Sequence, residues 1–506
     1  SIIVNPGPVM DPIPTQEICS GDSFTNINFV SNIGSSSYSW SLLNNNVPPN
    51  VSGYPQPTGT GNINGTSISN TGSSPYTLNY EVTPSSFGCN GSSENFEIIV
   101  NPELQVNFSL QDQTICDGSS SQIVNLSSNV SGVDIIWDVD NIPNGLLGVN
   151  TQSGNNAIPS FNLANTTTQP ITLNFTVQAL DPSDPSFCPG PEYSYSITVN
   201  PTPSIDPVQD LFYCNGSSNN EIIFSGTGNY YEWQHALPSI GIPASGNDTI
   251  PSLALQNNGN SPITSVFNVT PFFTNNNVTC SGVATDFEIT INPSGQINSL
   301  QNIAICNTDS VNQIQFTSNN TGGSNTYSWV NNNTSTGLIS NGTSPFTPAF
   351  VANNNTNSSN VSIVTITPTF SAFNLSCPGN TETFNITVNP TPIFTQLDDT
   401  LICNNTSFTY TPLTNVSSLY EWQGLPNVNV NGITTNIQNG SFIQDSLTNT
   451  SNVQQVVEYE VTPISSPEGC RGTTSTFEVT VQPDIIMTSP ESYEICSGTS
   501  VNSVLT

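Results

Sequence analysis

Basic residues are almost absent from this chain of 506 residues. It has one residue in the Lys plus Arg class (Arg471) and one His (His235), against 35 Asp and Glu, so the formal net charge is −34. Proteins that bind nucleic acids neutralise phosphates with basic side chains, and anionic membrane surfaces attract basic segments. The composition therefore argues against a nucleic-acid partner and against a membrane-surface partner. It also excludes lysine chemistry such as Schiff-base formation.

Long apolar runs and helical periodicity are missing as well. No stretch approaches the roughly 18 apolar residues of a membrane-spanning helix, so we expect no direct membrane insertion in this segment. The sequence shows neither an initiator Met nor a signal peptide. Ser1-Ile-Ile-Val-Asn-Pro6 matches residues 97–102, so we expect both ends to be cuts in a repeating array. The secretion signal and the anchor are then expected outside the segment.

Cysteines mark an internal repeat. The eleven are Cys19, Cys89, Cys116, Cys188, Cys214, Cys280, Cys306, Cys377, Cys403, Cys470 and Cys496. Long gaps of 66 to 72 residues alternate with short gaps of 26 or 27, and one Trp follows each of the first five odd-numbered cysteines by 19 to 23 residues. A fixed period of this length is typical of a tandem array. The predicted division is 1–6 (end of a preceding repeat), 7–102 (repeat 1), 103–201 (repeat 2), 202–293 (repeat 3), 294–390 (repeat 4), 391–483 (repeat 5) and 484–506 (start of repeat 6).

Each repeat contains the same strand-like segments. The closing segments are Phe96-Glu-Ile-Ile-Val-Asn-Pro102, Tyr195-Ser-Ile-Thr-Val-Asn-Pro201, Phe287-Glu-Ile-Thr-Ile-Asn-Pro293, Phe384-Asn-Ile-Thr-Val-Asn-Pro390 and Phe477-Glu-Val-Thr-Val-Gln-Pro483. Alternation of apolar and polar residues predicts half-buried strands, and Pro ends each ladder because it has no N–H to donate. Repeats of fewer than 100 residues with short strands and one Trp predict an all-β fold, an array of immunoglobulin-like β-sandwich domains forming an elongated rod.

These motifs resemble the PKD-like repeats of giant Bacteroidetes surface proteins, above all the SprB-type gliding-motility adhesins. The residues that carry the resemblance are Ile18-Cys-Ser-Gly21 and Ile495-Cys-Ser-Gly498, Tyr-x-Trp (38–40, 231–233, 327–329, 420–422), Tyr/Phe-x-Val-Thr-Pro (80–84, 267–271, 459–463), Cys-x-Gly at Cys89, Cys280 and Cys470, and Val-Asn-Pro. The resemblance covers the whole chain and implies export by the type IX secretion system. Repeats 4 and 5 depart from the first motif, with Cys306-Asn-Thr and Cys403-Asn-Asn, which leaves the turn geometry there open.

All eleven cysteines are expected in disulfides, because paired cysteines at regular spacing are typical of secreted chains. The single His and the lack of Cys-x-x-Cys argue against zinc. One pairing lies within a repeat, as in Cys19–Cys89. In an immunoglobulin-like strand order, however, the two cysteines of a repeat lie at opposite ends of strands about 33 Å long, too far apart for one bond. The alternative joins neighbouring repeats through Cys19–Cys188, Cys116–Cys280, Cys214–Cys377 and Cys306–Cys470, with Cys89, Cys403 and Cys496 pairing outside the segment.

No set of residues predicts catalysis. A hydrolytic triad needs a His, and His235 has no counterpart in the other repeats, so we interpret it as a strand-end residue near the surface. No cofactor is expected. Asp138 and Asp140 could offer oxygen ligands to Ca²⁺, and a solvated acidic edge is the alternative. We expect the five Trp in the cores, with Glu232 and Glu421 beside them facing outward.

Possible O-glycosylation sites follow from the resemblance. The same phylum glycosylates Asp-Ser/Thr-aliphatic triplets, and four occur here, which would place glycans on Thr249, Ser310, Thr400 and Ser446. Chance occurrence in a sequence rich in Ser and Thr is the alternative.

The sequence thus predicts a non-catalytic stalk segment of a large extracellular, cell-surface adhesin filament serving gliding motility and surface attachment. Its expected partners are other repeats of the same chain and an extracellular surface or polysaccharide. Two alternatives remain open, a passive spacer that carries a secreted enzyme or carbohydrate-binding module and a static extracellular fibre.

Overall fold

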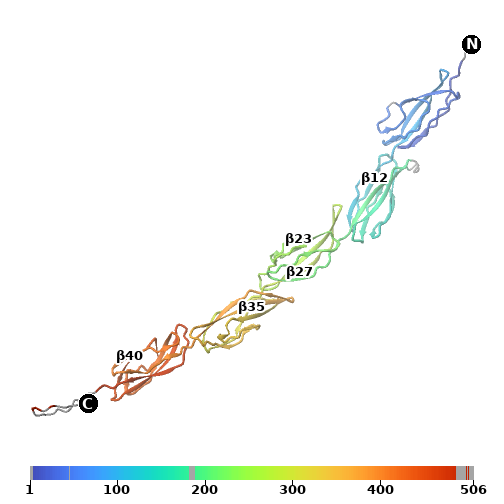
Figure 1. Cartoon of the computed structure of the whole chain (residues 1–506). Helices are drawn as coiled ribbons and strands as arrows, with labels where there is room; N and C mark the ends of the chain where they lie inside the picture. Colours follow the sequence, from blue (N-terminus) through green and yellow to red (C-terminus); the bar gives the residue numbers. More distant parts are fainter. Residues whose placement is uncertain (1–3, 45, 182–187, 486–496, 499, 501–506) are drawn as a thin grey trace.

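A computed structural model of the chain describes residues 4–44, 46–181, 188–485, 497–498 and 500. Five compact units follow one another in a line, and the two ends of the chain lie at opposite ends of the rod (Figure 1). Each unit has its own hydrophobic core, and the five cores draw their buried residues from 10–100, 104–199, 224–291, 316–388 and 408–481. We call these units repeats 1 to 5. The fold is all-β, a tandem array of immunoglobulin-like domains.

The principal sheet has the same order in every repeat: first strand, closing strand, long strand, Trp strand and a short edge strand. In repeat 1 these are β1 (Gln16–Cys19), β8 (Glu94–Asn101), β6 (Tyr76–Ser86), β2 (Ser37–Leu42) and β4 (Thr58–Thr60). In repeat 2 they are β10 (Gln113–Cys116), β19 (Tyr193–Asn200), β18 (Ile171–Leu180), β13 (Asp134–Val139) and β15 (Ser153–Asn155). In repeat 3 they are β20 (Leu211–Cys214), β27 (Thr285–Asn292), β25 (Ile263–Asn275), β22 (Tyr230–His235) and β23 (Ser245–Asn247). In repeat 4 they are β28 (Ile303–Cys306), β37 (Glu382–Asn389), β35 (Asn360–Ala372), β31 (Ser324–Asn331) and β32 (Asn341–Gly342). In repeat 5 they are β39 (Thr400–Ile402), β47 (Ser475–Val481), β46 (Gln455–Ser465), β42 (Ser418–Gly424) and β44 (Gln438–Gly440).

A hairpin strand extends the sheet beside the long strand in three repeats: β7 (Cys89–Asn90), β26 (Val278–Ser281) and β36 (Leu375–Pro378). Shorter strands cover the other side of each core: β3 (Val51–Ser52) and β5 (Ser69–Asn70) in repeat 1; β9 (Val106–Phe108), β11 (Ser119–Ser120), β12 (Val124–Ser128), β14 (Leu146–Leu147), β16 (Ala157–Ile158) and β17 (Asn162–Asn165) in repeat 2; β21 (Ile222–Ile223) and β24 (Thr249–Ile250) in repeat 3; β29 (Ser310–Val311), β30 (Ile314–Gln315), β33 (Phe346–Thr347) and β34 (Phe350–Val351) in repeat 4; and β38 (Phe394–Gln396), β40 (Thr406–Tyr410), β41 (Leu413–Thr414), β43 (Val430–Asn431) and β45 (Ile443–Asn449) in repeat 5. The described residues contain two 3₁₀ turns, η1 (Pro238–Ile240) and η2 (Thr334–Thr336), and no α-helix that could cross a membrane.

Strand direction puts the two cysteines of a repeat at opposite ends of its sheet. In repeat 3, β20 runs parallel to β27, and Cys214 lies opposite Asn292 at the end of the closing strand. β25 starts at that end and runs antiparallel to β27, and it then turns into β26, where Cys280 lies opposite Phe273. About ten strand residues, or roughly 33 Å, therefore separate Cys214 from Cys280.

The Trp of each repeat is a core residue, as expected; exposure of the five side chains ranges from 2% to 9%. A glycine on the edge strand makes room for the indole in repeats 1 to 4. A Cβ at Gly59, Gly154, Gly246 or Gly342 would lie 2.1–2.7 Å from a Trp ring atom. Only a residue without a side chain fits there.

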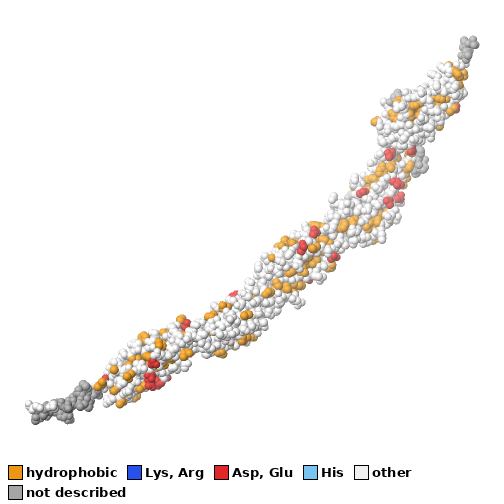
Figure 2. Space-filling view, in the orientation of Figure 1, with side chains coloured by type: hydrophobic (Ala, Val, Ile, Leu, Met, Phe, Trp, Pro, Cys, Tyr) orange, Lys and Arg blue, Asp and Glu red, His pale blue; other side chains and the backbone are white. Residues whose placement is uncertain are grey.

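Uncharged polar side chains and backbone, both drawn white, cover most of the face of the rod seen in Figure 2. On the face seen in Figure 2, acidic side chains form small, scattered groups and hydrophobic side chains form no single large patch. On this face the negative charge is therefore distributed along the rod and not concentrated in one patch.

Candidate functional site: the junctions between repeats

Four disulfides join neighbouring repeats. They are Cys19–Cys188, Cys116–Cys280, Cys214–Cys377 and Cys306–Cys470, with Cα–Cα distances of 5.3, 5.6, 5.4 and 5.5 Å. Each links the end of a first strand to the cysteine that follows the long strand of the next repeat. All four bonds therefore follow the second of the two expected patterns, in which cysteines of neighbouring repeats pair. The described residues contain no disulfide within a repeat. Cys89 and Cys403 are exposed and unpaired there, while Cys496 lies outside the described part of the chain.

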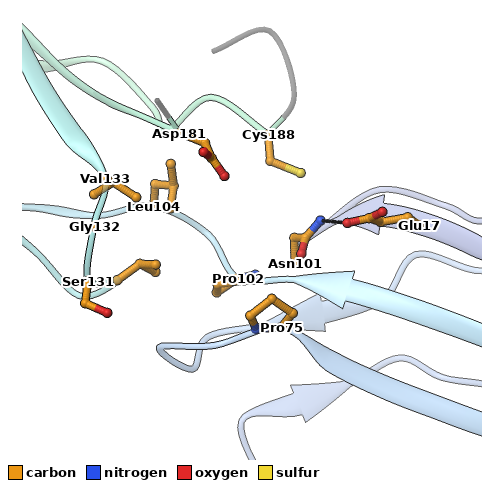
Figure 3. A pocket seen from close by; sticks show the side chains of 11 residues that line it. Glu17, Pro75, Asn101, Pro102, Leu104, Ser131, Gly132, Val133, Asp181 and Cys188 are labelled. Atoms are coloured by element: carbon orange, nitrogen blue, oxygen red, sulfur yellow. Dashed lines mark hydrogen bonds between the residues drawn. The ribbon is translucent and has the colours of Figure 1, made fainter. Parts of the chain in front are cut away.

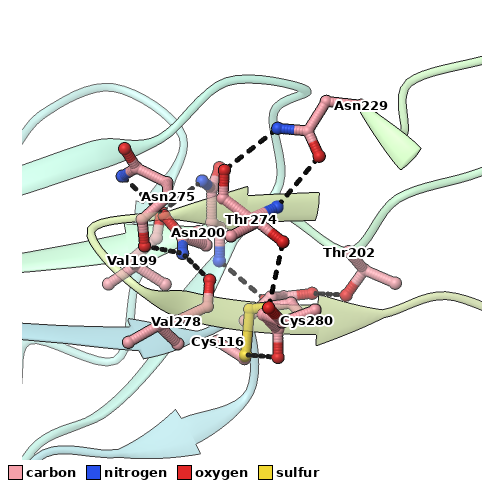
Figure 4. The surroundings of a disulfide bond; sticks show 12 residues. Cys116, Val199, Asn200, Thr202, Asn229, Thr274, Asn275, Val278 and Cys280 are labelled. Atoms are coloured by element: carbon pink, nitrogen blue, oxygen red, sulfur yellow. Dashed lines mark hydrogen bonds between the residues drawn. A yellow bond between two sulfur atoms is a disulfide. The ribbon is translucent and has the colours of Figure 1, made fainter. Parts of the chain in front are cut away.

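The closing-strand Asn receives the hairpin of the next repeat. At the junction of repeats 2 and 3, Asn200 Nδ2 donates to the carbonyl oxygens of Asn275 (3.4 Å) and Val278 (3.3 Å). Asn275 Nδ2 in turn donates to Asn200 Oδ1 at 2.9 Å, beside the Cys116–Cys280 bond (Figure 4). Asn292 binds the carbonyl of Ala372 in the same way at the next junction. At junctions 2/3 and 3/4 the Asn before the closing Pro thus has a role in joining repeats, whereas the sequence alone indicated only the end of a strand.

The tips of the two long hairpins meet a second residue of the preceding repeat. This residue lies two positions before the cysteine of the first strand. At junction 2/3 it is Thr114, whose hydroxyl accepts a hydrogen bond from Asn276 Nδ2 at 3.2 Å. At junction 3/4 it is Phe212, which stacks on Phe373 with ring centroids 5.1 Å apart. A polar residue meets a polar tip, and an aromatic residue meets an aromatic tip.

Loop contacts add a further link at three junctions. Asn129 Nδ2 donates to the carbonyl of Gly72 at 3.2 Å, and the Thr321 N–H donates to the carbonyl of Asn260 at 2.8 Å. Asn415 Nδ2 donates to Asn357 Oδ1 at 3.0 Å. These junctions are therefore held by hydrogen bonds in addition to a covalent bond.

Hollows at the seams are open and mostly polar. The one at junction 1/2, of about 580 Å³, is lined by Glu17, Asn101 and Pro102 from repeat 1 and by Leu104 and Cys188 from repeat 2, among others (Figure 3). Asn101 Nδ2 donates to Glu17 Oε1 at 2.8 Å, so this carboxylate already has a partner. Nothing in this hollow arranges an acid, a base and a nucleophile for catalysis.

The glycine of Cys-x-Gly lies where the inter-repeat linker crosses the hairpin. A Cβ on Gly91, Gly190, Gly282, Gly379 or Gly472 would lie 1.7–2.6 Å from a linker carbonyl oxygen. The motif therefore combines a cysteine for the bond with a glycine for the crossing.

The turn after the first-strand cysteine keeps its shape where the glycine is lost. Gly21, Gly118 and Gly216 have φ of 91°, 72° and 79°, and Thr308 and Asn405 replace them with φ of 75° and 57°. Asn tolerates this left-handed region, whereas a β-branched residue such as Thr is strained in it.

The interpretation of His235 as a residue near the surface is wrong. Its side chain is 8% exposed and stacks on Phe267 with centroids 4.2 Å apart. Nδ1 lies 2.8 Å from Ser265 Oγ, and Nε2 lies 2.7 Å from the carbonyl oxygen of Pro243. His235 stands two positions after Trp233 on the same strand, so period-2 alternation points it into the core.

Carboxylates in the described residues form no metal cluster: no three His, Cys, Asp or Glu side chains come close enough there to share an ion. Asp140 accepts a hydrogen bond from Thr176 at 2.6 Å. Glu232 faces outward as predicted, and partly exposed Glu421 forms an ion pair with Arg471. The hydrogen bond from Arg471 holds the pKa of Glu421 below its usual value.

The four glycosylation candidates differ in exposure: Ser310 and Ser446 are exposed, and Thr249 and Thr400 are half-buried. The Asp of each triplet has a structural role. Asp248 accepts from the Tyr231 N–H, Asp309 from the Cys306 N–H, Asp399 from the Glu478 N–H and Asp445 from the Thr434 N–H. Folding alone therefore accounts for these aspartates.

A buried Asn in every repeat escaped the sequence analysis. These residues are Asn70, Asn165, Asn257, Asn354 and Asn449, all at most 5% exposed. In repeat 3, Asn257 Nδ2 donates to the carbonyls of Ser261 (2.9 Å) and Ile291 (2.7 Å), and Oδ1 accepts from the Gly259 N–H (3.0 Å). In every repeat this Asn comes 31 to 35 residues before the residue that precedes the closing Pro. That recurring position is the signal that could have revealed it.

Comparison with known proteins agrees with the repeat architecture. Residues 16–104 and 400–485 match the model of the PKD-like domain family. No curated protein sequence matches the chain significantly.

Three solved structures align along most of the chain. The protocadherin γB4 extracellular domain shares 11% identity, with 95% of this chain and 84% of that chain covered at a TM-score of 0.26. The human desmocollin-1 ectodomain shares 10% identity, with 93% of this chain and 98% of that chain covered at a TM-score of 0.24. Sidekick-1 immunoglobulin domains 1–5 share 12% identity, with 94% of this chain and 99% of that chain covered at a TM-score of 0.23. These overall superpositions are poor, so the assignment depends on the sheets, the cores and the family match. The chain is a tandem array of immunoglobulin-like repeats, two of which match the PKD-like domain family.

Proposed function

We propose that this chain is a stalk segment of a large cell-surface adhesin filament that serves gliding motility and surface attachment. The observation that carries the proposal is the series of disulfides across four successive junctions. A flexible tether needs only the peptide linker between domains. A covalent bond beside each linker is useful where the array has to keep its direction and transmit force.

The load path supports this role. Tension that leaves repeat 2 through the linker after Asn200 also passes through Cys116 to Cys280 in the next hairpin. Each of these four junctions then has two covalent connections in parallel, and at junction 2/3 the hydrogen bonds between Asn200 and Asn275 lie beside them. Pulling on one repeat is expected to move its neighbour as a body.

The chemistry of the chain suits an extracellular location. Disulfides persist in oxidising compartments outside the cytosol. One Lys or Arg in 506 residues leaves almost no cleavage site for trypsin-like proteases, and the charge of −34 keeps neighbouring filaments apart. Repeats of this fold are typically non-catalytic, and we assign no enzymatic role.

Secretion, anchoring and ligands remain part of the proposal. We place export with the type IX system, attachment to a surface or polysaccharide, and glycans on Thr249, Ser310, Thr400 and Ser446. Intact-mass and glycopeptide analysis of protein from its native cells would test for the glycans. Unmodified peptides at all four positions would refute this part of the proposal.

Tracking the segment on living cells tests the function. A fluorescent antibody fragment against repeats 1 to 5 should label spots that travel along the cell surface at the speed of cell movement. Fixed or shed label would overturn the motility role and leave a passive fibre or spacer. Monovalent fragments are needed, since bivalent antibodies would cross-link filaments and stop them.

A further inference from the structure

Exposed Cys403 and Cys89 have the surroundings of paired cysteines. β39 runs parallel to β47 with Ile402 opposite Val481, and the Gln482 N–H donates to the carbonyl of Ile402 at 3.0 Å. The first strands that end at Cys116, Cys214 and Cys306 pair with their closing strands in the same way. Asn405 holds the left-handed turn that follows, as Gly118 and Gly216 do. Cys403 therefore has the strand register of the bonded cysteines, with Gln482 in the place of Asn200 and Asn292.

Cys89 lies on the other side of a junction, the hairpin that follows a long strand. It stands opposite Ser86 in the hairpin, and the Gly91 N–H donates to the carbonyl of Pro84 at 2.8 Å. The chain at Pro8 crosses Gly91 as Pro203 crosses Gly282 beside paired Cys280. Phe87, at the tip of this hairpin, is 70% exposed. The crossing is therefore already in the position that a junction uses. The hairpin is shorter than those at junctions 2/3 and 3/4, with Phe87 two residues before Cys89.

We propose that Cys403 and Cys89 are preformed half-junctions, each of which forms a disulfide with another repeat of this same type. The partner of Cys403 is the cysteine of a Cys-x-Gly hairpin, and the partner of Cys89 is a cysteine that ends a first strand. This inference rests on junction geometry and is independent of the motility role.

The residue beside Cys403 specifies the partner further. Leu401 occupies the position of Thr114 and Phe212, two residues before the cysteine, and is 63% exposed. At the two junctions with long hairpins, Thr114 meets polar Asn276 and Phe212 meets aromatic Phe373, so apolar Leu401 suits a long hairpin whose tip is apolar. The partner hairpin of Cys403 is thus expected to carry an apolar residue four positions before its cysteine, as Phe373 stands before Cys377.

Bond formation is a two-electron oxidation. A thiolate of one repeat attacks the disulfide of an oxidant, such as oxidised glutathione, and releases one thiol. The second cysteine thiolate attacks the mixed disulfide and releases the other thiol. Two cysteine thiols are oxidised to one disulfide, and one glutathione disulfide is reduced to two thiols.

Peptide mapping of the full protein from its native cells tests the pairing. Thiols are alkylated without reduction, the protein is cut with pepsin, and disulfide-linked peptides are sequenced by mass spectrometry. We expect Cys403 linked to a Cys-x-Gly peptide with an apolar residue four positions before the cysteine, and Cys89 linked to a first-strand peptide. The Cys116–Cys280 peptide is the internal control. Alkylated Cys89 and Cys403, or a bond between either of them and any other site, would overturn the proposal.

A variant series tests the selection by Leu401. In the full protein equilibrated with reduced and oxidised glutathione, Leu401→Ser should raise the ratio of free to bonded Cys403 about threefold to tenfold, the range for losing the burial of one or two methylene groups. Ile437→Ser, which changes a side chain 59% exposed elsewhere in repeat 5, is the matched control. Both sites are exposed, so folding is not at risk. Equal ratios in the two variants would refute the selectivity assigned to Leu401, while a free Cys403 in the unchanged protein would refute the half-junction itself.

Discussion

The interior of a repeat and the junction between two repeats are stabilised by different interactions. Inside a repeat, fully buried side chains such as Phe267 and Ile289 pack around Trp233. Asn257 Nδ2 donates hydrogen bonds to one carbonyl in a loop and one in a strand. At a junction, one disulfide and a few hydrogen bonds connect two repeats, and at junction 3/4 the stacked rings of Phe212 and Phe373 join them. The core is held by the burial of apolar surface, while the junction depends on a covalent bond.

This difference has a physical reason. A repeat loses a large conformational entropy when it folds and needs burial to offset that loss. Two folded repeats lose little more when they dock, so a small set of directional contacts is enough to set their angle. Interiors therefore determine whether a repeat folds, and junctions determine how straight the rod is.

The largest expected effect comes from removing an inter-repeat disulfide. Cys116→Ser combined with Cys280→Ser should free junction 2/3 and remove up to about 5 kcal/mol of chain constraint on the unfolded state. The cores of repeats 2 and 3 should stay folded at 25 °C because neither contains the bond. Small-angle scattering should report a shorter maximum dimension and a bend, and hydrogen exchange should rise at residues 275–278. A rod that stays straight would show that hydrogen bonds alone fix the angle.

Removing the buried Asn tests the interior. Asn257→Ala leaves two carbonyls and one N–H without partners, and each such loss costs about 1–3 kcal/mol. We expect repeat 3 to lose about 3 kcal/mol or more, seen as faster hydrogen exchange across β25 and β27, with the other repeats unchanged. The neighbouring exposed Asn258→Ala is the control. Equal effects of the two variants would refute the role assigned to Asn257.

Relieving a strained turn should stabilise a junction face. Thr308 has φ of 75°, which costs a non-glycine residue about 1–2 kcal/mol. Thr308→Gly should therefore raise the stability of repeat 4 by about 1 kcal/mol, less the entropy cost of glycine in the unfolded chain. The readout is the calorimetric transition of repeat 4. The reverse change Gly216→Thr in repeat 3 should be destabilising, and an opposite sign for either variant would contradict the argument.

The smallest effect concerns alkaline pH. Burial, together with the hydrogen bond to Asp445, raises the pKa of Tyr459 above its ordinary 10.0. The unfolded chain ionises first, so this contribution is complete below pH 10 and is lost as the pH rises through the folded pKa. The loss should be about 1 kcal/mol per pH unit above 10. Tyr459→Phe should flatten the fall in the melting temperature of repeat 5 above that pH, at a cost of about 1 kcal/mol at neutral pH.

A control tyrosine separates this effect from general alkaline damage. Tyr54→Phe in repeat 1 should leave the pH dependence of repeat 5 unchanged. An unchanged slope in Tyr459→Phe would show that other ionisations govern the loss.

Much of the architecture was predictable because it repeats. Alternation in Phe287–Asn292 identifies a half-buried strand whatever its neighbours are. The spacing of the cysteines, taken with an immunoglobulin-like strand order, was enough to favour bonds between neighbouring repeats, since a strand is longer than a disulfide can reach. Periodic patterns of this kind express local geometry, which the sequence determines directly.

Other features depend on packing between residues distant in the chain. The sequence determined by itself that the chain is all-β, repeating and strongly acidic, because composition and period do not depend on the fold. Only the tertiary structure decided that His235 meets Ser265, that Asn257 bonds to Ile291, and that Phe212 meets Phe373 across a seam. Alternation or a recurring place in the repeat can mark a polar side chain as buried, but neither names its hydrogen-bond partners. Its place is determined by which backbone groups the folded chain leaves to be satisfied, and those are known only once strands far apart in sequence lie side by side.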